Sequence, residues 1–162
     1  MTYRAAPGMS IGHVHLKVSD LQRSIAFYTD VIGLEVMQTY GDQAAFLSAG
    51  GYHHHVGLNT WESLGGTRPP GKATGLYHAA FLFPDRPSLG RAVANVVAHD
   101  VALAGAADHG VSEAVYFDDP DGNGIELYHD RPREDWPRDT DGLLAMVNAP
   151  LDIAALIADG AL

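Results

Sequence analysis

Two histidines are the first residues in this chain whose type and spacing point to chemistry. His13 lies in the segment Ile11–Asp20, and His78 occupies the same place in Leu76–Asp85, so that aligning the two segments puts His on His and Asp on Asp. Neutral imidazole is a common ligand of divalent metals, whereas a packing role requires no identical residue in both copies. The match therefore predicts a metal site shared between two copies of one repeated unit.

A carboxylate completes this candidate ligand set. In the stretch Gly124–Asp130, the apolar residues Ile125 and Leu127 alternate with Glu126, which predicts a strand that turns Glu126 away from the helices. Two imidazoles and one carboxylate leave coordination positions open for substrate and oxygen, an arrangement that non-haem Fe(II) prefers, although Mn, Ni or Zn accept the same donors. The alternative interpretation places Glu126 on the solvent face of an edge hairpin.

Other polar residues are candidates for acid–base catalysis. His53 and His55 share one face of an expected strand over Tyr52–Asn59, and the parity of Tyr116 is compatible with the same cavity. An exposed polar strand end is the alternative for the histidine run. His109 stands in an irregular segment with a glycine, where a surface residue is the alternative interpretation.

The elements that must position these residues form a repeat. A strand, a helix that begins after Ser19-Asp20, and three further short strands predict a βαβββ module over about residues 10–60. Residues 61–74 are rich in Gly, Pro and Thr and predict a linker, and a second βαβββ module is expected over about 75–130. The fold class is α+β: two paired modules forming one open, cup-shaped mixed sheet with flanking helices, in a single domain. The tail 131–162 contains a short apolar helix candidate, Leu151–Ala158, which we interpret as a clasp or a dimer contact.

Composition excludes several classes of protein. The chain has 162 residues, 46% of them hydrophobic, which suffices for one core, and it has no cysteine, which rules out disulfides, thiolate metal sites and a cysteine nucleophile. The formal net charge of −10 argues against nucleic acid and anionic lipid as partners. The N-terminus has no apolar signal segment, and no stretch is apolar enough to span a membrane, so we expect a cytoplasmic protein.

These segments resemble the vicinal oxygen chelate superfamily (glyoxalase, bleomycin resistance protein, extradiol dioxygenase), and within it the branch similar to catechol 2,3-dioxygenase. The resemblance covers about residues 10–137 and rests on GHVHLKVSDLQRSIAFYTDVIGLEV, GGYHHHVGLNTW, TGLYHAAFLFPDR and DHGVSEAVYFDDPDGNGIELYHDRPREDW. It implies a metal held by His13, His78 and Glu126. It also implies acid–base roles for His55 or His53, for His109 and for Tyr116.

The resemblance implies an Fe(II) extradiol dioxygenase that cleaves a catechol-type aromatic ring with O2. Two alternatives stay open: a glyoxalase I-like isomerase or lyase, in which His53 or His55 is a fourth ligand, and a metal-free protein that binds an aromatic drug. Typical extradiol enzymes are about twice as long as this chain. We expect a homodimer, with the site lying either within one chain or across the interface.

Overall fold

The computed structural model describes residues 2–161 and has the predicted α+β fold of two modules, in which each module forms an open sheet of its own where one shared sheet was expected. Its strands are β1 (Val14–Lys17), β2 (Glu35–Tyr40), β3 (Ala44–Ser48), β4 (Val56–Asn59), β5 (Ala79–Phe83), β6 (Leu103–Asp108), β7 (Ser112–Asp118), β8 (Gly124–Asp130) and β9 (Ala149–Pro150). Its helical segments are α1 (Leu21–Ala26), which continues as the π-helical turn η1 (Phe27–Val31), α2 (Arg86–Ala98), the 3-10 turn η2 (Arg133–Asp135) and α3 (Ile153–Gly160).

The repeat is visible in the pairing of the strands. The first sheet has the order β1-β4-β3-β2 and the second the order β5-β8-β7-β6-β9, so each module places its first strand beside its last. Both of these pairs are parallel, with His15 opposite Gly57 in one sheet and Ala80 opposite Glu126 in the other. Gly57 is therefore the counterpart of Glu126 in the first module.

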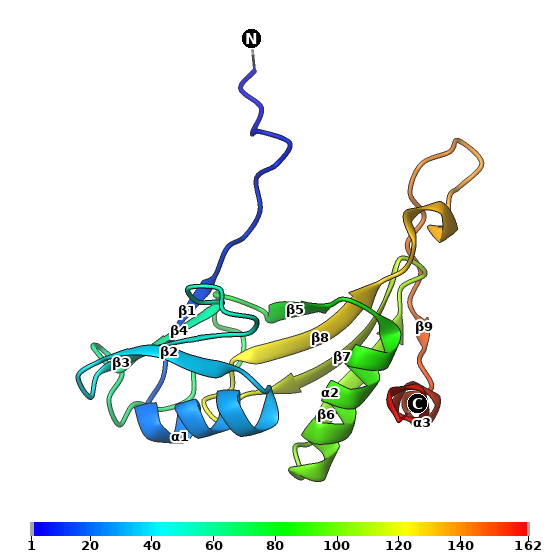
Figure 1. Ribbon diagram of the computed structural model, residues 1–162. Coiled ribbons are helices and arrows are strands. Elements are labelled where there is room, and N and C mark those ends of the chain that lie inside the picture. Colours follow the sequence, from blue (N-terminus) through cyan, green and yellow to red (C-terminus); the bar gives the residue numbers. More distant parts are fainter. Residues whose placement is uncertain (1, 162) are drawn as a thin grey trace.

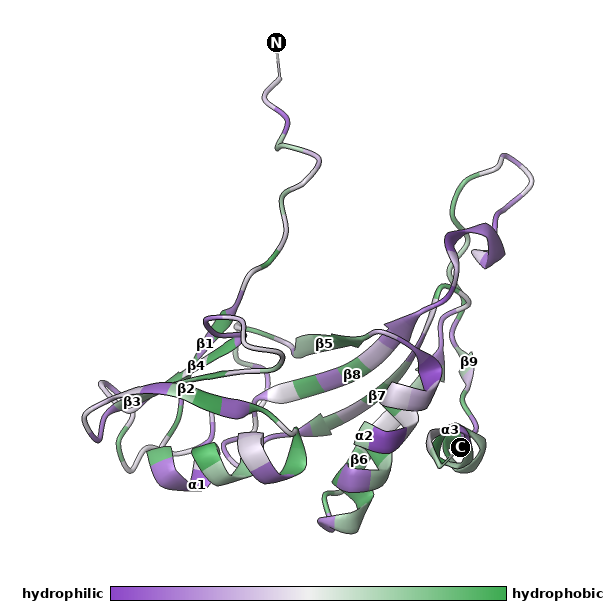
Figure 2. Ribbon diagram, viewed as in Figure 1, coloured by the Kyte–Doolittle hydropathy of each residue, from purple (hydrophilic) through white to green (hydrophobic). Residues whose placement is uncertain are grey.

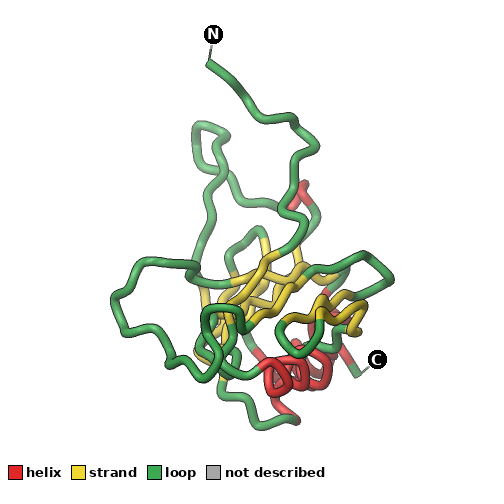
Figure 3. The backbone as a smooth tube through the Cα atoms, turned by 90° about the vertical axis from the view of Figure 1, so that its left-hand side faces the viewer, coloured by secondary structure: helices red, strands yellow, loops and turns green. Residues whose placement is uncertain are grey.

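The matched aspartates of the repeat start the two main helices. Asp20 accepts a hydrogen bond from the backbone N of Arg23, and Asp85 accepts one from the backbone N of Ser88, at 3.1 and 2.7 Å. Both are N-caps, which satisfy helix amides that have no partner within the helix. Helices α1 and α2 lie along the same side of the sheets (Figures 1 and 3). The identical Asp in the two copies therefore has a structural role.

Alternation along the strands separates the core from the opposite face. Ile125 and Leu127 of β8 are fully buried in the hydrophobic core, while Glu126 between them is only half-buried on the other side, as predicted. Figure 2 shows this alternation of apolar and polar residues along β8. The strand thus buries its apolar face against the helices and turns its carboxylate to the concave side.

The expected strand Tyr52–Asn59 is wrong in its first half, because β4 begins only at Val56. Gly50 and Gly51 have φ values of 65° and 75°, a left-handed conformation that ends β3 and sends the chain into a loop. The histidines at 53–55 lie in this loop, so strand parity does not sort their side chains. Strand β1 begins at Val14, so His13 lies directly before it.

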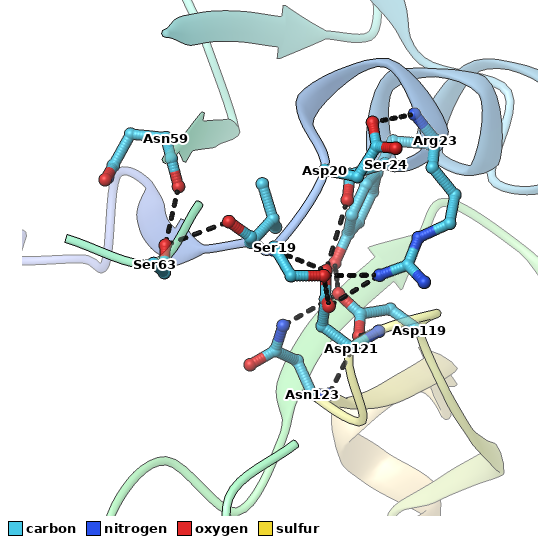
Figure 4. Close-up of polar contacts among 11 residues, drawn as sticks. Ser19, Asp20, Arg23, Ser24, Asn59, Ser63, Asp119, Asp121 and Asn123 are labelled. Atoms are coloured by element: carbon cyan, nitrogen blue, oxygen red, sulfur yellow. Dashed lines mark hydrogen bonds and ion pairs between the residues drawn. The ribbon is translucent and has the colours of Figure 1, made fainter. Parts of the chain in front are cut away.

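A turn of the second module binds the first module through a group that we call the inter-module clasp: Ser19, Arg23, Tyr28, Asp119 and Asp121. Figure 4 shows Ser19, Arg23, Asp119 and Asp121. The Asp121 carboxylate accepts hydrogen bonds from Ser19 Oγ and Arg23 Nη2, each at 2.6 Å, and from Ser19 N at 3.1 Å. The buried Tyr28 hydroxyl donates to Asp119 Oδ2 at 3.1 Å. Burial raises the pKa of Asp121, but the hydrogen bonds from Ser19 and Arg23 outweigh it and hold that pKa below its usual value.

The C-terminal tail closes on the second module. Helix α3 packs on α2, with Leu156 fully buried, and the two helices approach closely where Gly90 faces Gly160. A Cβ atom at Gly90 would overlap the carbonyl oxygen of Leu156, so this approach requires glycine. Strand β9 pairs antiparallel with β6. Of the two expected roles of the tail, the structure shows packing against its own domain.

Among residues 2–161, every helix is too short or too polar to cross a membrane.

Candidate metal and acid–base site

Four of the seven predicted site residues lie in one chain of contacts on the second module. His78, directly before β5, places Nε2 at 2.8 Å from Oε2 of Glu126. The Tyr116 hydroxyl of β7 donates to the other carboxylate oxygen at 3.1 Å, because β7 pairs with β8 in a register that sets Tyr116 opposite Glu126. His109 Nε2 lies 2.9 Å from the same hydroxyl. The structure thus connects an imidazole, a carboxylate, a phenol and a second imidazole.

The phenol of Tyr116 stays protonated over a wide pH range. Burial, followed by the charge of Glu126 and the hydrogen bond to it, raises the pKa of Tyr116 to about 12. A phenol in this state keeps its O–H and donates it, whether to the carboxylate or to a negative charge that develops beside it.

The His78–Glu126 pair fits two ligands of one cation. Nitrogen and oxygen ligands lie about 2.0–2.2 Å from a divalent metal, so two adjacent ligands at the right angle of octahedral coordination are about 3 Å apart. The 2.8 Å between Nε2 and Oε2 matches this separation. In addition, the buried Nδ1 of His78 has no hydrogen-bond partner among residues 2–161, so the ring nitrogen opposite the one facing Glu126 is unsatisfied.

The third predicted ligand, His13, is not brought into this pair. Residues 2–161 contain no group of three or more His, Cys, Asp or Glu side chains placed to hold a metal ion. The exposed ring of His13 instead lies 4.3 Å from the ring of His54 and 6.4 Å from that of His53, measured between centroids. Burial, followed by the proximity of His13 and His53, lowers the pKa of His54.

His55 is anchored to the first module. Its Nδ1 lies 3.0 Å from Ser48 Oγ and accepts a hydrogen bond from the backbone N of Ala49 at 3.3 Å. A backbone amide can only donate, so Nδ1 of His55 carries no hydrogen and the neutral ring keeps its proton on Nε2. His53 and His54 are joined differently, since their Nδ1 atoms lie 2.7 Å apart and share one hydrogen.

Two cavities adjoin these residues. The larger, about 470 Å³, lies at the seam where β1 and β5 are adjacent (Figure 1), and both His13 and His55 line it together with β5. The smaller, about 330 Å³, is lined by His78 and Tyr116. Each half of the predicted site therefore borders a space large enough for a small molecule.

Sequence reasoning missed the surroundings of His15. Its ring lies 5.5 Å from the ring of Trp61 and 5.9 Å from that of Phe46, and it covers Gly57. Burial, followed by the charge of His13, lowers the pKa of His15. The shared face of His13 and His15 was visible from alternation, but Trp61 lies in the expected linker and carried no signal.

Fold and site together are those of a paired-βαβββ protein that presents imidazole and carboxylate donors on its concave side. The model of the glyoxalase/bleomycin resistance protein/dioxygenase superfamily matches residues 10–127, and the chain belongs to that superfamily. The predicted family is thus confirmed.

Individual relatives differ in their activities. A catechol-2,3-dioxygenase of Bacillus subtilis is 44% identical over 147 residues, which are 91% of this chain but 50% of that protein, so the chain spans about half of its length. A lactoylglutathione lyase of Salmonella typhimurium is 30% identical over 125 residues, covering 74% of this chain and 91% of the lyase. A crystal structure of a glyoxalase/dioxygenase from Nostoc punctiforme superposes with a TM-score of 0.65 at 26% identity, over 82% of this chain and 99% of that one.

Proposed function

We propose that this protein is an Fe(II)-dependent extradiol dioxygenase, which cleaves a catechol-type aromatic ring with O2 at a metal held by His13, His78 and Glu126. Similarity to a catechol-2,3-dioxygenase over most of the chain supports the reaction class. The observation that carries the proposal is the contact chain from His78 through Glu126 and Tyr116 to His109. This series of contacts connects the His78–Glu126 pair, which is suited to hold a metal, with the Tyr116 hydroxyl. That hydroxyl is a donor suited to a reaction that develops negative charge.

The residues of this chain have distinct tasks in the proposed reaction. Bound iron would supply the redox chemistry with oxygen and lower the pKa of the catechol hydroxyls. Tyr116, which remains a phenol, donates a hydrogen bond toward the negative charge, and His109, in contact with its hydroxyl, is the acid–base residue at this end of the site. His55 keeps Nε2 protonated and acts as a donor, so we assign acceptance of the catechol proton to the His53–His54 pair.

Ring cleavage tests this proposal directly. Protein loaded with Fe(II) without oxygen, then given catechol and air, is expected to form a yellow ring-fission product with consumption of O2. His78→Ala removes a ligand and is expected to lose at least about 100-fold in rate and most of the bound iron. His99→Ala, at the exposed end of α2, is the matched control and keeps both. A panel of catechols that consumes no oxygen with iron-loaded protein would contradict the proposal.

We further propose that the protein is a homodimer in which His13 of one copy completes the site of the other. The motivation is that His13 lies beside the seam cavity but outside the His78–Glu126 pair of its own chain. Mixing inactive His13→Ala and Glu126→Ala proteins then restores one intact site in each mixed dimer, or about a quarter of the wild-type rate. Absence of recovery after verified subunit exchange would place all three ligands within one chain.

The isomerase alternative lacks a carboxylate in the first module. Gly57 is the counterpart of Glu126, and the His15 ring lies 2.9 Å from where its Cβ atom would be, so no side chain fits there. A lyase that moves a proton between two carbons needs a base near the metal. With one carboxylate at the site, we expect no isomerase activity from Ni- or Zn-loaded protein on the hemithioacetal of methylglyoxal and glutathione.

The third alternative, a metal-free aromatic-drug-binding protein, predicts the same metal content in wild type and His78→Ala. Metal analysis of both proteins, purified without chelator, separates it from the dioxygenase.

A further inference from the structure

The C-terminal tail reaches the acid–base end of the site. Just before β9, the backbone N of Val147 donates to the carbonyl oxygen of His109 at 3.0 Å. The carbonyl oxygen of Val147 in turn lies 3.1 Å from Nδ1 of the His109 ring. Val147 thus binds both the main chain and the side chain of a residue 38 positions earlier.

This second contact determines where the His109 ring carries its hydrogen. A carbonyl oxygen only accepts, so Nδ1 must be the protonated nitrogen in the contact with Val147. The other nitrogen, Nε2, faces the Tyr116 hydroxyl at 2.9 Å. In the neutral ring Nε2 accepts the single hydrogen of the Tyr116 hydroxyl, which then no longer donates to Glu126; in the charged ring Nε2 donates to the hydroxyl oxygen, and the hydroxyl donates to Glu126. In either state Nδ1 keeps its hydrogen on the Val147 carbonyl.

We propose that Val147 is a positioning residue, whose carbonyl holds His109 as the Nδ1–H tautomer and thereby leaves Nε2 as the acceptor that faces the Tyr116 hydroxyl. The value of this arrangement for catalysis rests on the proposed function, but the tautomer itself does not. Without the carbonyl, the ring can carry its hydrogen on Nε2 instead, and Nε2 then donates to the Tyr116 oxygen and cannot accept.

The tail is built to hold this carbonyl in place. Strand β9, two residues after Val147, pairs with Ala107 and Asp108, so the main chains on both sides of the contact are tied to each other. Gly110 adds a steric constraint, since a Cβ atom there would lie 2.8 Å from Pro137 Cγ and 3.2 Å from Val147 Cγ2. At the end of the tail, Asp159 of α3 forms an ion pair with Arg86 of α2. The position of the carbonyl is therefore constrained by the pairing of β9 with β6 and by the packing at Gly110.

Nitrogen-15 NMR of the histidine rings tests the proposal with full-length protein. The chemical shifts and couplings of the two ring nitrogens distinguish the tautomers, and the spectrum of His109→Asn identifies the signals of His109. In the wild type at a pH where the ring is neutral, we expect the Nδ1–H form to dominate. Predominance of the Nε2–H form in the wild type would overturn the proposal without the need for any Val147 variant.

A pair of substitutions at Val147 tests the cause. Val147→Ala keeps the backbone contacts and is expected to keep the wild-type tautomer. Val147→Pro removes the N–H that binds the His109 carbonyl, and we expect it to shift the ring toward Nε2–H and, in the iron-loaded enzyme, to lower kcat roughly tenfold or more with KM within about twofold. An unchanged tautomer in a folded Val147→Pro protein would contradict the positioning role. If ring cleavage is absent in the wild type, the tautomer measurement still decides this proposal, so the two failures are distinguishable.

Discussion

Replacing Tyr28 by Phe isolates the buried hydrogen bond of the inter-module clasp. The side chain is fully buried, and its hydroxyl donates to Asp119, which is 5% exposed. Asp119 also accepts from the side chain and backbone N of Asn123 and from the backbone N of Asp121, at 2.8, 2.8 and 2.9 Å. The carboxylate therefore keeps three donors when the hydroxyl is removed, and the phenyl ring keeps its packing.

The expected loss of stability follows from this count. A hydrogen bond to a charged group contributes about 1.5–3 kcal/mol, and we expect the lower end, about 1.5 kcal/mol, because Asp119 remains largely satisfied in Tyr28→Phe. Asp119→Ala is expected to cost more, about 3 kcal/mol, because it leaves the Tyr28 hydroxyl buried without an acceptor and takes the acceptor from the turn amides. The order of the two losses is a consequence of the geometry alone.

Urea unfolding followed by tryptophan fluorescence measures both losses. Tyr40→Phe, at a tyrosine that is 66% exposed, serves as the control and is expected to stay within about 0.5 kcal/mol of the wild type. The slope of unfolding free energy against urea should not change, because the surface that becomes exposed on unfolding is nearly the same in all these proteins. A Tyr28→Phe protein as stable as the Tyr40→Phe control, or one destabilised as much as Asp119→Ala, would refute the reasoning.

Three further predictions concern the pH dependence of stability, the C-terminal tail and the His78–Glu126 pair. Burial raises the pKa of Asp121, but the hydrogen bonds from Ser19 and Arg23 hold it below the usual value. The stabilisation by this carboxylate is therefore complete above about pH 4 and is lost as pH falls through the folded-state pKa. In urea unfolding, we expect Asp121→Asn to be destabilised at about pH 7 and to be much closer to the wild type at about pH 2.5. Leu156→Ala, at a fully buried position, is expected to cost about 2–5 kcal/mol in the same assay, and a cost below about 1 kcal/mol would mean that α3 does not pack as described. Gly124→Ala would place a methyl group 3.2 Å from His78 Cβ and against the neighbouring main chain, so we expect calorimetry to show metal affinity reduced at least about tenfold, while Gly71→Ala, in open space, binds as the wild type does.

The periodic parts of the sequence predicted the fold well. The alternation around Glu126 gave its strand, its direction and the burial of its neighbours, because a strand with one apolar face has a single favourable orientation. The repeat at His13 and His78 predicted two matching modules. In the structure, the first strand of each module pairs parallel with the last strand of the same module. These features are local, so neighbouring residues carry the information.

The parts of the site that depend on loops could not be predicted. The histidine run was assigned by strand parity, which fails because Gly50 and Gly51 turn the chain before it. His109 had no expected partner, yet its ring reaches Tyr116, since this contact depends on how the chain turns between two strands. The contact with Val147 is more remote still, because nothing in the sequence around residue 147 indicates which strand edge the tail follows.

The close approach of Gly90 and Gly160 determines which changes the tail tolerates. Where two main chains meet without side chains between them, a single added carbon forces them apart, so neither position has a conservative substitute. The exposed hairpin-like segment around Asp139 has no such close approach of main chains, and its one constraint of this kind is the positive φ of 77° at Gly142. Peptide tags or fluorophores should therefore be introduced at this tip, where they leave the anchoring of the last helix intact.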